Sequence, residues 1–250
     1  MIQKFNVWFA PSGENRRIHL YLPDDYYHTT ERYATLYMFD GHNLFYDADA
    51  TYGTCLGLKE FIDHWRKKLI VVGIESTRDD YVRVHEFVPY DVVSRQYGPI
   101  HGRADATLNW LVHDLKPKID ADYRTYYFRE ATSIAGYSMG GLTALYGVLR
   151  YNRYISKAAI ISPSIMIAKD AFLHELNTHE YYSDTRIFFS WGTNEYDAKT
   201  NWEVSQDILA VEKKIQEKGM KTYILCQHGG AHCEASWREQ TETWMNFLWF

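Results

Sequence analysis

The chain has 250 residues, of which 46% are hydrophobic and 24% charged, proportions typical of a globular domain with a substantial core. Its 27 lysines and arginines against 32 acidic residues give a formal net charge of −5, and the basic residues form no run. A weakly acidic chain of this kind lacks the electrostatic footprint of a nucleic-acid-binding protein. The length fits one α/β domain covering residues 1–250.

Three cysteines, Cys55, Cys226 and Cys233, are widely and irregularly spaced. Because they match neither a zinc motif nor a disulfide framework, we expect free thiols, no metal and a cytoplasmic location. The N-terminus shows no signal-peptide h-region, and the clearest aliphatic run, 69–72, is far too short to cross a bilayer. We therefore expect no membrane partner, and leave homo-oligomer formation open.

Two early segments, 5–9 and 17–22, alternate apolar and polar residues and are separated by the turn residues Pro11-Ser12-Gly13. This alternation predicts antiparallel strands with one face in the core. Short continuous apolar runs then alternate with stretches of helical period, which predicts a mostly parallel central sheet with helices on both faces. The apolar runs lie at 34–39, 69–74, 132–135, 158–161, 187–190 and 222–225.

The helical period appears as three apolar stripes, running from Leu108 to Ile119, from Val204 to Ile215 and from Trp237 to Leu248. Gly219 is expected to end the second helix. The stretch 75–103 fits neither period, so we expect an ordered excursion over the strand ends, where long loops tend to carry function. The pattern as a whole is that of an α/β fold with an antiparallel N-terminal edge.

The motif Gly136-Tyr137-Ser138-Met139-Gly140 matches G-x-S-x-G between a predicted strand and a predicted helix. In this setting a serine lies on a strained strand-to-helix turn that projects its hydroxyl above the sheet. Glycines are expected at both ends of the motif because strand and helix approach closely there. The motif alone is common by chance, but its context favours Ser138 as a nucleophile.

A serine nucleophile needs a histidine base that is oriented by a carboxylate. His228 and His232 both follow the last predicted strand, and we favour His232 because it lies on a glycine-rich loop just before the final helix. A zinc site at these two histidines lacks a third ligand. For the acid, Glu195 and Asp197 both qualify by position, and position alone does not separate them.

The tetrahedral intermediate of acyl transfer needs two backbone N–H donors, one of them from the residue after the nucleophile, Met139. The second is expected in the loop 40–45, which follows the strand at 34–39 directly.

Several segments together resemble the Putative esterase family of α/β hydrolases, which includes enterochelin esterases, feruloyl and acetyl-xylan esterases, S-formylglutathione hydrolase (esterase D) and mycolyltransferases. The resemblance runs from about Tyr21 to Phe250. It is carried by Asp40-Gly41-His42-Asn43-Leu44-Phe45, Arg83 with Glu86-Phe87-Val88-Pro89, Gly136 to Gly141, Gly192-Thr193-Asn194-Glu195, and Gly229 to His232 with Trp237-Arg238.

The resemblance implies an α/β-hydrolase fold and roles for particular residues. It implies His42 N–H as the second oxyanion donor, Glu195 as the acid and His232 as the base. It also implies a pocket built partly by the excursion 75–103, with Asp40, Arg83 and Trp237 as candidates for contact with the substrate. For Arg83, an internal ion pair with Glu86 is at least as well supported by the spacing.

The function expected from these features is hydrolysis of a small-molecule carboxylic ester without cofactor or metal. Acyl transfer and thioester hydrolysis use the same triad, and a catalytically silent binding protein is an alternative of another class. We expect a short acyl group on a sugar, phenolic or similar alcohol. The reason is that no lid-like amphipathic segment is present, whereas the excursion carries Tyr81, Phe87, Tyr90 and Tyr97 among polar residues.

Overall fold

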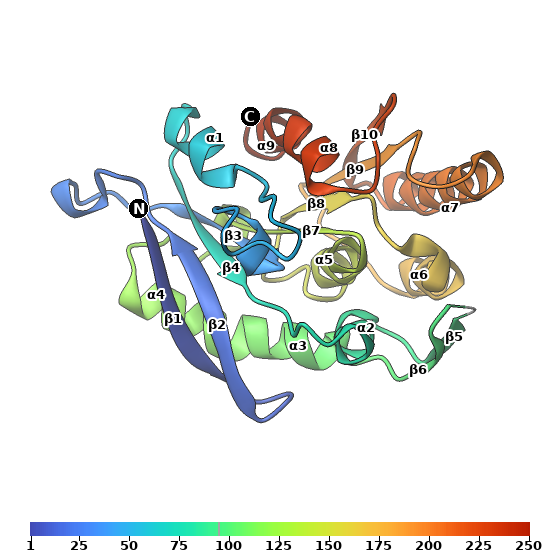
Figure 1. Cartoon of the computed structure of the whole chain (residues 1–250), viewed down its shortest axis with the longest axis horizontal. Coiled ribbons are helices and arrows are strands. Elements are labelled where there is room, and N and C mark those ends of the chain that lie inside the picture. The colour runs from blue at the N-terminus through green and yellow to red at the C-terminus, as the bar shows by residue number, and fades with distance from the viewer. Residues whose placement is uncertain (95) are drawn as a thin grey trace.

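A computed structural model describes residues 1–94 and 96–250, and a sheet of eight strands runs through its centre (Figure 1). The strand order is β1-β2-β4-β3-β7-β8-β9-β10. β2 runs antiparallel to both β1 and β4, and every other neighbouring pair is parallel. The strands are β1 (Ile2–Phe9), β2 (Glu14–Tyr21), β3 (Ala34–Phe39), β4 (Leu69–Ile74), β7 (Thr132–Tyr137), β8 (Lys157–Ile161), β9 (Arg186–Gly192) and β10 (Lys221–Gln227).

All eight strands lie where the sequence predicts them, and their burial explains the two kinds of pattern. β4 and β7 are buried at every position, as expected for strands that are covered on both faces. β10 lies at the edge of the sheet and has no buried residue. The fold is therefore the predicted α/β-hydrolase arrangement, a mostly parallel sheet with an antiparallel N-terminal edge.

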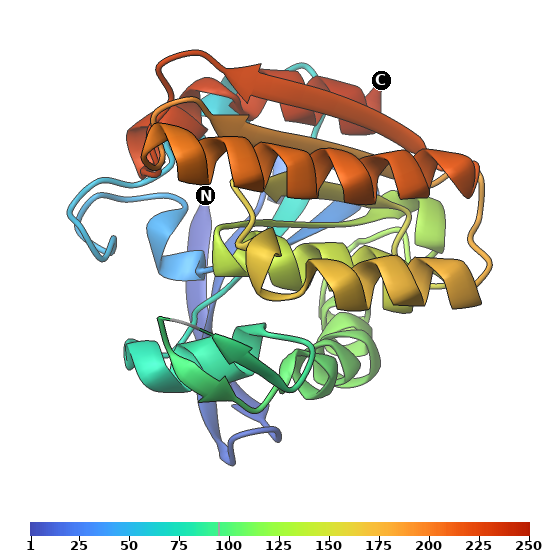
Figure 2. The same ribbon diagram turned by 90° about the vertical axis from the view of Figure 1, so that its right-hand side faces the viewer.

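Helices cover both faces of the sheet, each over its own apolar cluster. One cluster joins the sheet to α3, α5, α6 and α7, and the other joins it to α1, α8 and α9. Figure 2 shows α5, α6 and α7 side by side on the face turned to the viewer. The helices are α1 (Leu58–His64), α2 (Asp80–Phe87), α3 (Ala104–Trp110), α4 (Lys116–Asp122), α5 (Met139–Arg150), α6 (Lys169–Thr178), α7 (Ala198–Glu217), α8 (Glu234–Glu239) and α9 (Thr241–Trp249).

The three predicted helical stripes are present, with local departures from regular helix. A π-helical turn, Leu111–Leu115, joins α3 to α4, so the first stripe lies on one continuous helical segment. The third stripe is divided between α8 and α9 at Gln240. Gly219 follows the end of α7 with a φ of +84°, a conformation that glycine adopts without strain, as predicted for a helix-terminating residue.

The stretch 75–103 is more regular than the sequence pattern indicates. It contains α2 and a small antiparallel hairpin of β5 (Val92–Ser94) and β6 (Gly98–Ile100), which lie next to each other in Figure 2. Its helical signal is weak because two polar residues, His85 and Glu86, are buried beside Val84 and Phe87. Within residues 75–94 and 96–103, the excursion is built around a helix and a hairpin.

Candidate active site

Ser138 lies at the turn between β7 and α5, with φ 53° and ψ −121°. Two backbone hydrogen bonds hold this turn, from Ser138 N–H to Ile161 O at 3.0 Å and from Ser164 N–H to Ser138 O at 3.1 Å. The close approach predicted for the glycines is real at Gly136, where a Cβ would lie 2.2 Å from Gly140 O. Gly140 has more room, since its Cβ would meet Asp40 and Phe39 at 3.3 Å.

Backbone strain is concentrated around this serine. In the described chain, Asp40, Ser138 and Ser162 are the only residues other than glycine with positive φ. Asp40 and Ser138 line one cavity, and the Ser162 hydroxyl accepts a hydrogen bond from the indole N–H of Trp237, which lines the same cavity. Strained residues of this kind persist where the surrounding structure holds them, often at functional sites.

Glu195 is the carboxylate that meets His232. Its Oε2 lies 2.9 Å from His232 Nδ1, and its side chain is only 2% exposed. The other oxygen, Oε1, accepts hydrogen bonds from Ser162 Oγ at 2.5 Å and from Gly192 N–H at 2.6 Å. With three partners in a buried position, this carboxylate is fixed in orientation and can hold the imidazole in one tautomer.

Asp197, the other candidate acid, has a different role. It is exposed and caps α7 by accepting hydrogen bonds from the N–H groups of Lys199 and Thr200. The Thr200 hydroxyl and these backbone donors lower the pKa of Asp197. Within the described chain it forms no hydrogen bond or ion pair with His232, which pairs with Glu195.

The loops that carry Glu195 and His232 approach each other through two glycines. A Cβ on Gly192 would lie 2.0 Å from Gly230 O, so the backbones touch where β9 and β10 end. A hydrogen bond from Asn194 N–H to Gly230 O at 2.9 Å fixes the same approach. The glycines before His232 therefore allow this loop to pack closely against the loop that carries Glu195, as well as to extend back across the edge of the sheet.

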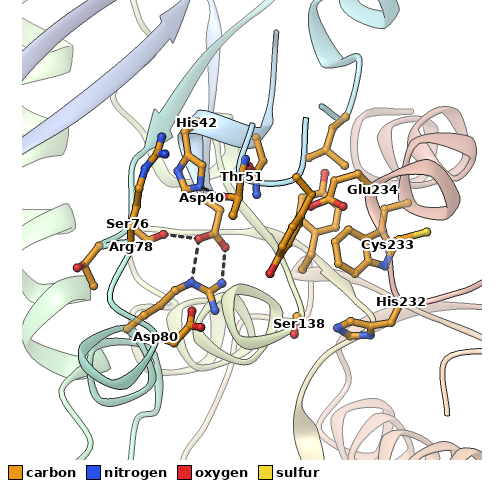
Figure 3. Close-up of a pocket in the computed structure, with 17 residues that line it drawn as sticks. Asp40, His42, Thr51, Ser76, Arg78, Asp80, Ser138, His232, Cys233 and Glu234 are labelled. Atoms are coloured by element: carbon orange, nitrogen blue, oxygen red, sulfur yellow. Dashed lines mark hydrogen bonds and ion pairs between the residues drawn. The ribbon is translucent and has the colours of Figure 1, made fainter. Parts of the chain in front are cut away.

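Ser138 and His232 face the same cavity (Figure 3). The Ser138 hydroxyl lies 3.4 Å from Ser164 Oγ, and among the described residues no hydrogen bond joins it to His232. Bonds between a nucleophile and its base are often long before substrate binds. His228 is exposed and does not line this cavity.

The two predicted oxyanion donors, His42 N–H and Met139 N–H, belong to the turns that follow β3 and β7. Neither amide donates to a backbone carbonyl outside its own helix in the described chain. The His42 ring Nε2 lies 2.9 Å from Thr51 Oγ1, and burial lowers the pKa of His42 despite the nearby Asp40 and Glu75. The lowered pKa favours a neutral imidazole on the residue whose backbone N–H is a predicted oxyanion donor.

Arg83 pairs with Asp40, which corrects the alternative that it pairs with Glu86. Its Nη2 donates to Asp40 Oδ2 at 2.7 Å and its Nε to Oδ1 at 3.1 Å. Ser76 Oγ donates to the same Oδ1 (Figure 3). Burial alone would raise the pKa of Asp40, but Arg83 and Ser76 outweigh it and the pKa is lowered. Glu86 instead binds the buried Arg16 of β2 through both oxygens.

The cavity holds about 430 Å³. Its wall is formed by the 3₁₀ turn η2 (Gly41–Asn43) and its following loop, by residues 76–83, and by the segment 232–237, which includes the start of α8. Its aromatic residues are Tyr52, Tyr137 and Trp237. The excursion contributes polar residues to the wall, including Arg83, whereas its four aromatic residues do not line the cavity. Phe87 is buried in the core, Tyr90 packs on Tyr146 and Phe172, Tyr97 packs against the same core, and Tyr81 is exposed.

Three residues of the site are not identified from the sequence. Ser162 follows an apolar strand run and precedes a proline, so only its position at a strand end could have indicated it. Tyr137 and Glu234 lie next to recognised motif residues, yet nothing in their identity shows that they line the cavity. In the described residues, no group of three or more His, Cys, Asp or Glu is arranged to hold a metal ion. No helix there is long and apolar enough to cross a membrane.

The chain belongs to the esterase family described as "Putative esterase", whose model matches residues 10–244. This membership makes the protein an α/β hydrolase that acts on esters, as the sequence motifs predict. A curated relative, "Uncharacterized protein YbbA" of Bacillus subtilis, is 23% identical over 87% of this chain and 86% of its own length.

Solved structures share the fold over almost the whole chain. An IroE-like serine hydrolase from Shewanella oneidensis superposes with a TM-score of 0.78 and 18% identity, covering 99% of this chain and 79% of that one. The siderophore hydrolase EstA from Aspergillus nidulans gives a TM-score of 0.78 at 16% identity, covering 99% and 95%.

Proposed function

We propose that this ester hydrolase works through Ser138 as nucleophile, His232 as general base and acid, and Glu195 as the carboxylate that orients the histidine. The observation that carries the proposal is the buried Glu195–His232 hydrogen bond at one cavity with the strained Ser138. Glu195 accepts the proton on His232 Nδ1, which leaves Nε2 free to receive the proton of the serine hydroxyl.

The chemistry proceeds in two acyl transfers. Ser138 Oγ attacks the ester carbonyl carbon while His232 removes its proton, and the negative oxygen that forms receives hydrogen bonds from the N–H groups of Met139 and His42. When the intermediate collapses, His232 gives the proton to the leaving alcohol and the acyl group remains on Ser138. Water, deprotonated by His232, then attacks the acyl-enzyme and releases the acid and the free serine.

We propose a short acyl group on a sizeable alcohol as the substrate class. The polar residues 76–83 and the aromatic residues Tyr52, Tyr137 and Trp237 share the cavity wall. Such a wall suits a hydroxylated or aromatic group better than a long alkyl chain. Product analysis with added alcohols distinguishes hydrolysis from transfer of the acyl group to an acceptor other than water. Comparing thioester with oxyester rates distinguishes a thioesterase.

Labelling with a fluorophosphonate probe tests the nucleophile. We expect one labelled serine, Ser138, when the modified peptide is mapped by mass spectrometry. Ser138→Ala should lose the label and reduce kcat/KM for p-nitrophenyl acetate by roughly 10⁴-fold or more. His232→Ala should be nearly as damaging, whereas His228→Ala, at an exposed position outside the cavity, is the matched control. Labelling at another serine, or an active Ser138→Ala protein, would overturn the proposal.

A further inference from the structure

Glu234 is a buried carboxylate in the wall of the active-site cavity. It is the first residue of α8, and it lines the cavity together with His232, two positions earlier (Figure 3). The residue is 8% exposed. Among the described residues its carboxylate has no hydrogen bond or ion pair with another residue. Burial raises the pKa of Glu234, and the negative charge of Asp40 adds to the rise.

Every other acidic residue in the buried part of the described chain has a side-chain partner. Asp40 is paired with Arg83, Glu86 with Arg16, Glu175 with the hydroxyl of Tyr90, and Glu212 with Gln216 and Thr222. The Glu234 oxygens are not sealed from solvent, and they open into the cavity that Glu234 lines. A substrate group that replaces water there must satisfy the carboxylate, because a polar group left unpaired on binding is costly. Glu234 is the exception, and it lies where a substrate would bind.

Tyr137 offers a second unpaired polar group on the same wall. Its ring stacks on Trp237 with centroids 5.0 Å apart, and the residue is 5% exposed. Within the described chain its hydroxyl has no hydrogen-bond partner. Burial, followed by the charges of Glu234 and Asp40, raises the pKa of Tyr137 well above its usual value. The hydroxyl therefore stays protonated and can donate.

We propose that Glu234 and Tyr137 recognise a hydroxyl group on the alcohol portion of the ester, with Glu234 accepting its proton and Tyr137 donating to its oxygen. This inference rests on the proposed function. The alcohol portion is assigned because His232 must protonate the leaving oxygen, so that oxygen lies on the His232 side of the cavity. Glu234 follows His232 on the same segment.

A hydroxyl fits this pair better than a cation does. A hydroxyl both donates and accepts, and so satisfies the carboxylate and the tyrosine together. An ammonium group only donates, so it would pair with Glu234 and leave the Tyr137 proton without an acceptor. A site built to bind a substrate hydroxyl discriminates strongly against an analogue that lacks it, because the polar groups of the protein then remain unpaired.

The test compares acetate esters in which a terminal hydroxyl is replaced by a methyl group. The pairs are 2-hydroxyethyl with propyl acetate, 3-hydroxypropyl with butyl acetate, and 4-hydroxybutyl with pentyl acetate, which vary the distance from ester to hydroxyl. We expect kcat/KM to favour the hydroxyl ester in at least one pair by about tenfold or more. In Glu234→Leu and Tyr137→Phe that ratio should fall toward one, whereas Glu234→Gln, whose amide oxygen still accepts a hydrogen bond, should lower it less. The ratio is internal to each variant, and Glu239→Gln, at an exposed position on the same helix, should keep the wild-type ratio.

Several results would overturn the inference. The first is a wild-type enzyme that shows no preference for the hydroxyl ester in any pair. The second is that Glu234→Leu and Tyr137→Phe both keep the wild-type ratio. A third is a preference for acetylcholine over its neutral analogue 3,3-dimethylbutyl acetate that exceeds every hydroxyl ratio and is lost on substitution of Glu234. Fluorophosphonate labelling of Ser138 and hydrolysis of p-nitrophenyl acetate are measured on the same wild-type preparation. If these two succeed while the ratios fail, the inference is wrong and the proposed function stands.

Discussion

Glu195 and Asp197 lie two residues apart in the loop after β9, and only their surroundings distinguish them. Glu195 is buried among three hydrogen-bond partners, including His232, whereas Asp197 is exposed and caps a helix. Both are carboxylates after a late strand, so the sequence leaves the choice open and the family resemblance alone favours Glu195. The Gly192 amide lies three residues before Glu195 at the end of β9. The other two partners, Ser162 and His232, come from the loops after β8 and β10.

We expect Glu195→Gln to reduce kcat/KM by roughly 10³- to 10⁴-fold, because an amide no longer selects the imidazole tautomer that accepts the serine proton. Asp197→Asn should change kcat/KM little, since asparagine is an equally good helix cap. The measurement is kcat/KM for p-nitrophenyl acetate in both variants, with unfolding curves to show that each is folded. The reverse ranking would make Asp197 the acid. Full activity in both would indicate a serine–histidine pair without an acid.

The ion pair of Arg83 shows that sequence spacing does not identify the partner of a single charged residue. Arg83 and Glu86 are three apart on α2, a spacing that permits an ion pair on the helix surface. Both are instead used in tertiary contacts, Arg83 with Asp40 after β3 and Glu86 with Arg16 on β2. In the interior, a carboxylate and a guanidinium form an ion pair because an unpaired buried charge is costly. Which carboxylate meets which guanidinium is determined by the fold.

At the scale of elements, the sequence predicts the sheet well because buried parallel strands are short apolar runs with few other interpretations. It misses α2 because a short helix with buried polar residues has no clear apolar stripe. The nucleophile turn is predicted from its glycines, and the structure shows the physical reason at Gly136. The contact between Gly192 and Gly230 is a similar close approach that joins two loops far apart in the sequence.

We expect Gly192→Ala to be more damaging than Gly140→Ala. A Cβ at Gly192 would lie 2.0 Å from a backbone oxygen, so the loops carrying Glu195 and His232 must separate. At Gly140 the nearest atoms are 3.3 Å away and belong to side chains. Overpacking costs typically about 1–3 kcal/mol of unfolding free energy, and Gly192→Ala should reach or exceed that range. Denaturant unfolding and kcat/KM of both variants check this, and equal losses would show that the loop contact does not position the site.

At the scale of the whole molecule, the site gathers at the carboxyl ends of the parallel strands. Asp40, Ser138 and Ser162 follow β3, β7 and β8, and Glu195 and His232 lie on the loops after β9 and β10. In α/β sheets this edge is where ligands bind, so strand order alone brings these residues together. The cavity wall is less predictable, because the aromatic residues of 75–103 turn to the core or the surface, and Tyr52 and Tyr137 line the cavity in their place.

The length of acyl group that the site accepts depends on the whole cavity. The cavity holds about 430 Å³, and charged and polar side chains interrupt its wall on several sides, among them Asp40, Arg83 and Glu234. In a continuous apolar groove each added methylene gains up to about 0.8 kcal/mol when fully buried. In a cavity whose wall is interrupted by polar groups, methylenes beyond a short chain should instead add little binding free energy. We expect kcat/KM to be highest for p-nitrophenyl acetate or butyrate and to fall through octanoate to palmitate, measured below any micelle threshold. A profile that climbs through octanoate and peaks at longer chains would contradict the short-acyl proposal and indicate a lipase-like groove.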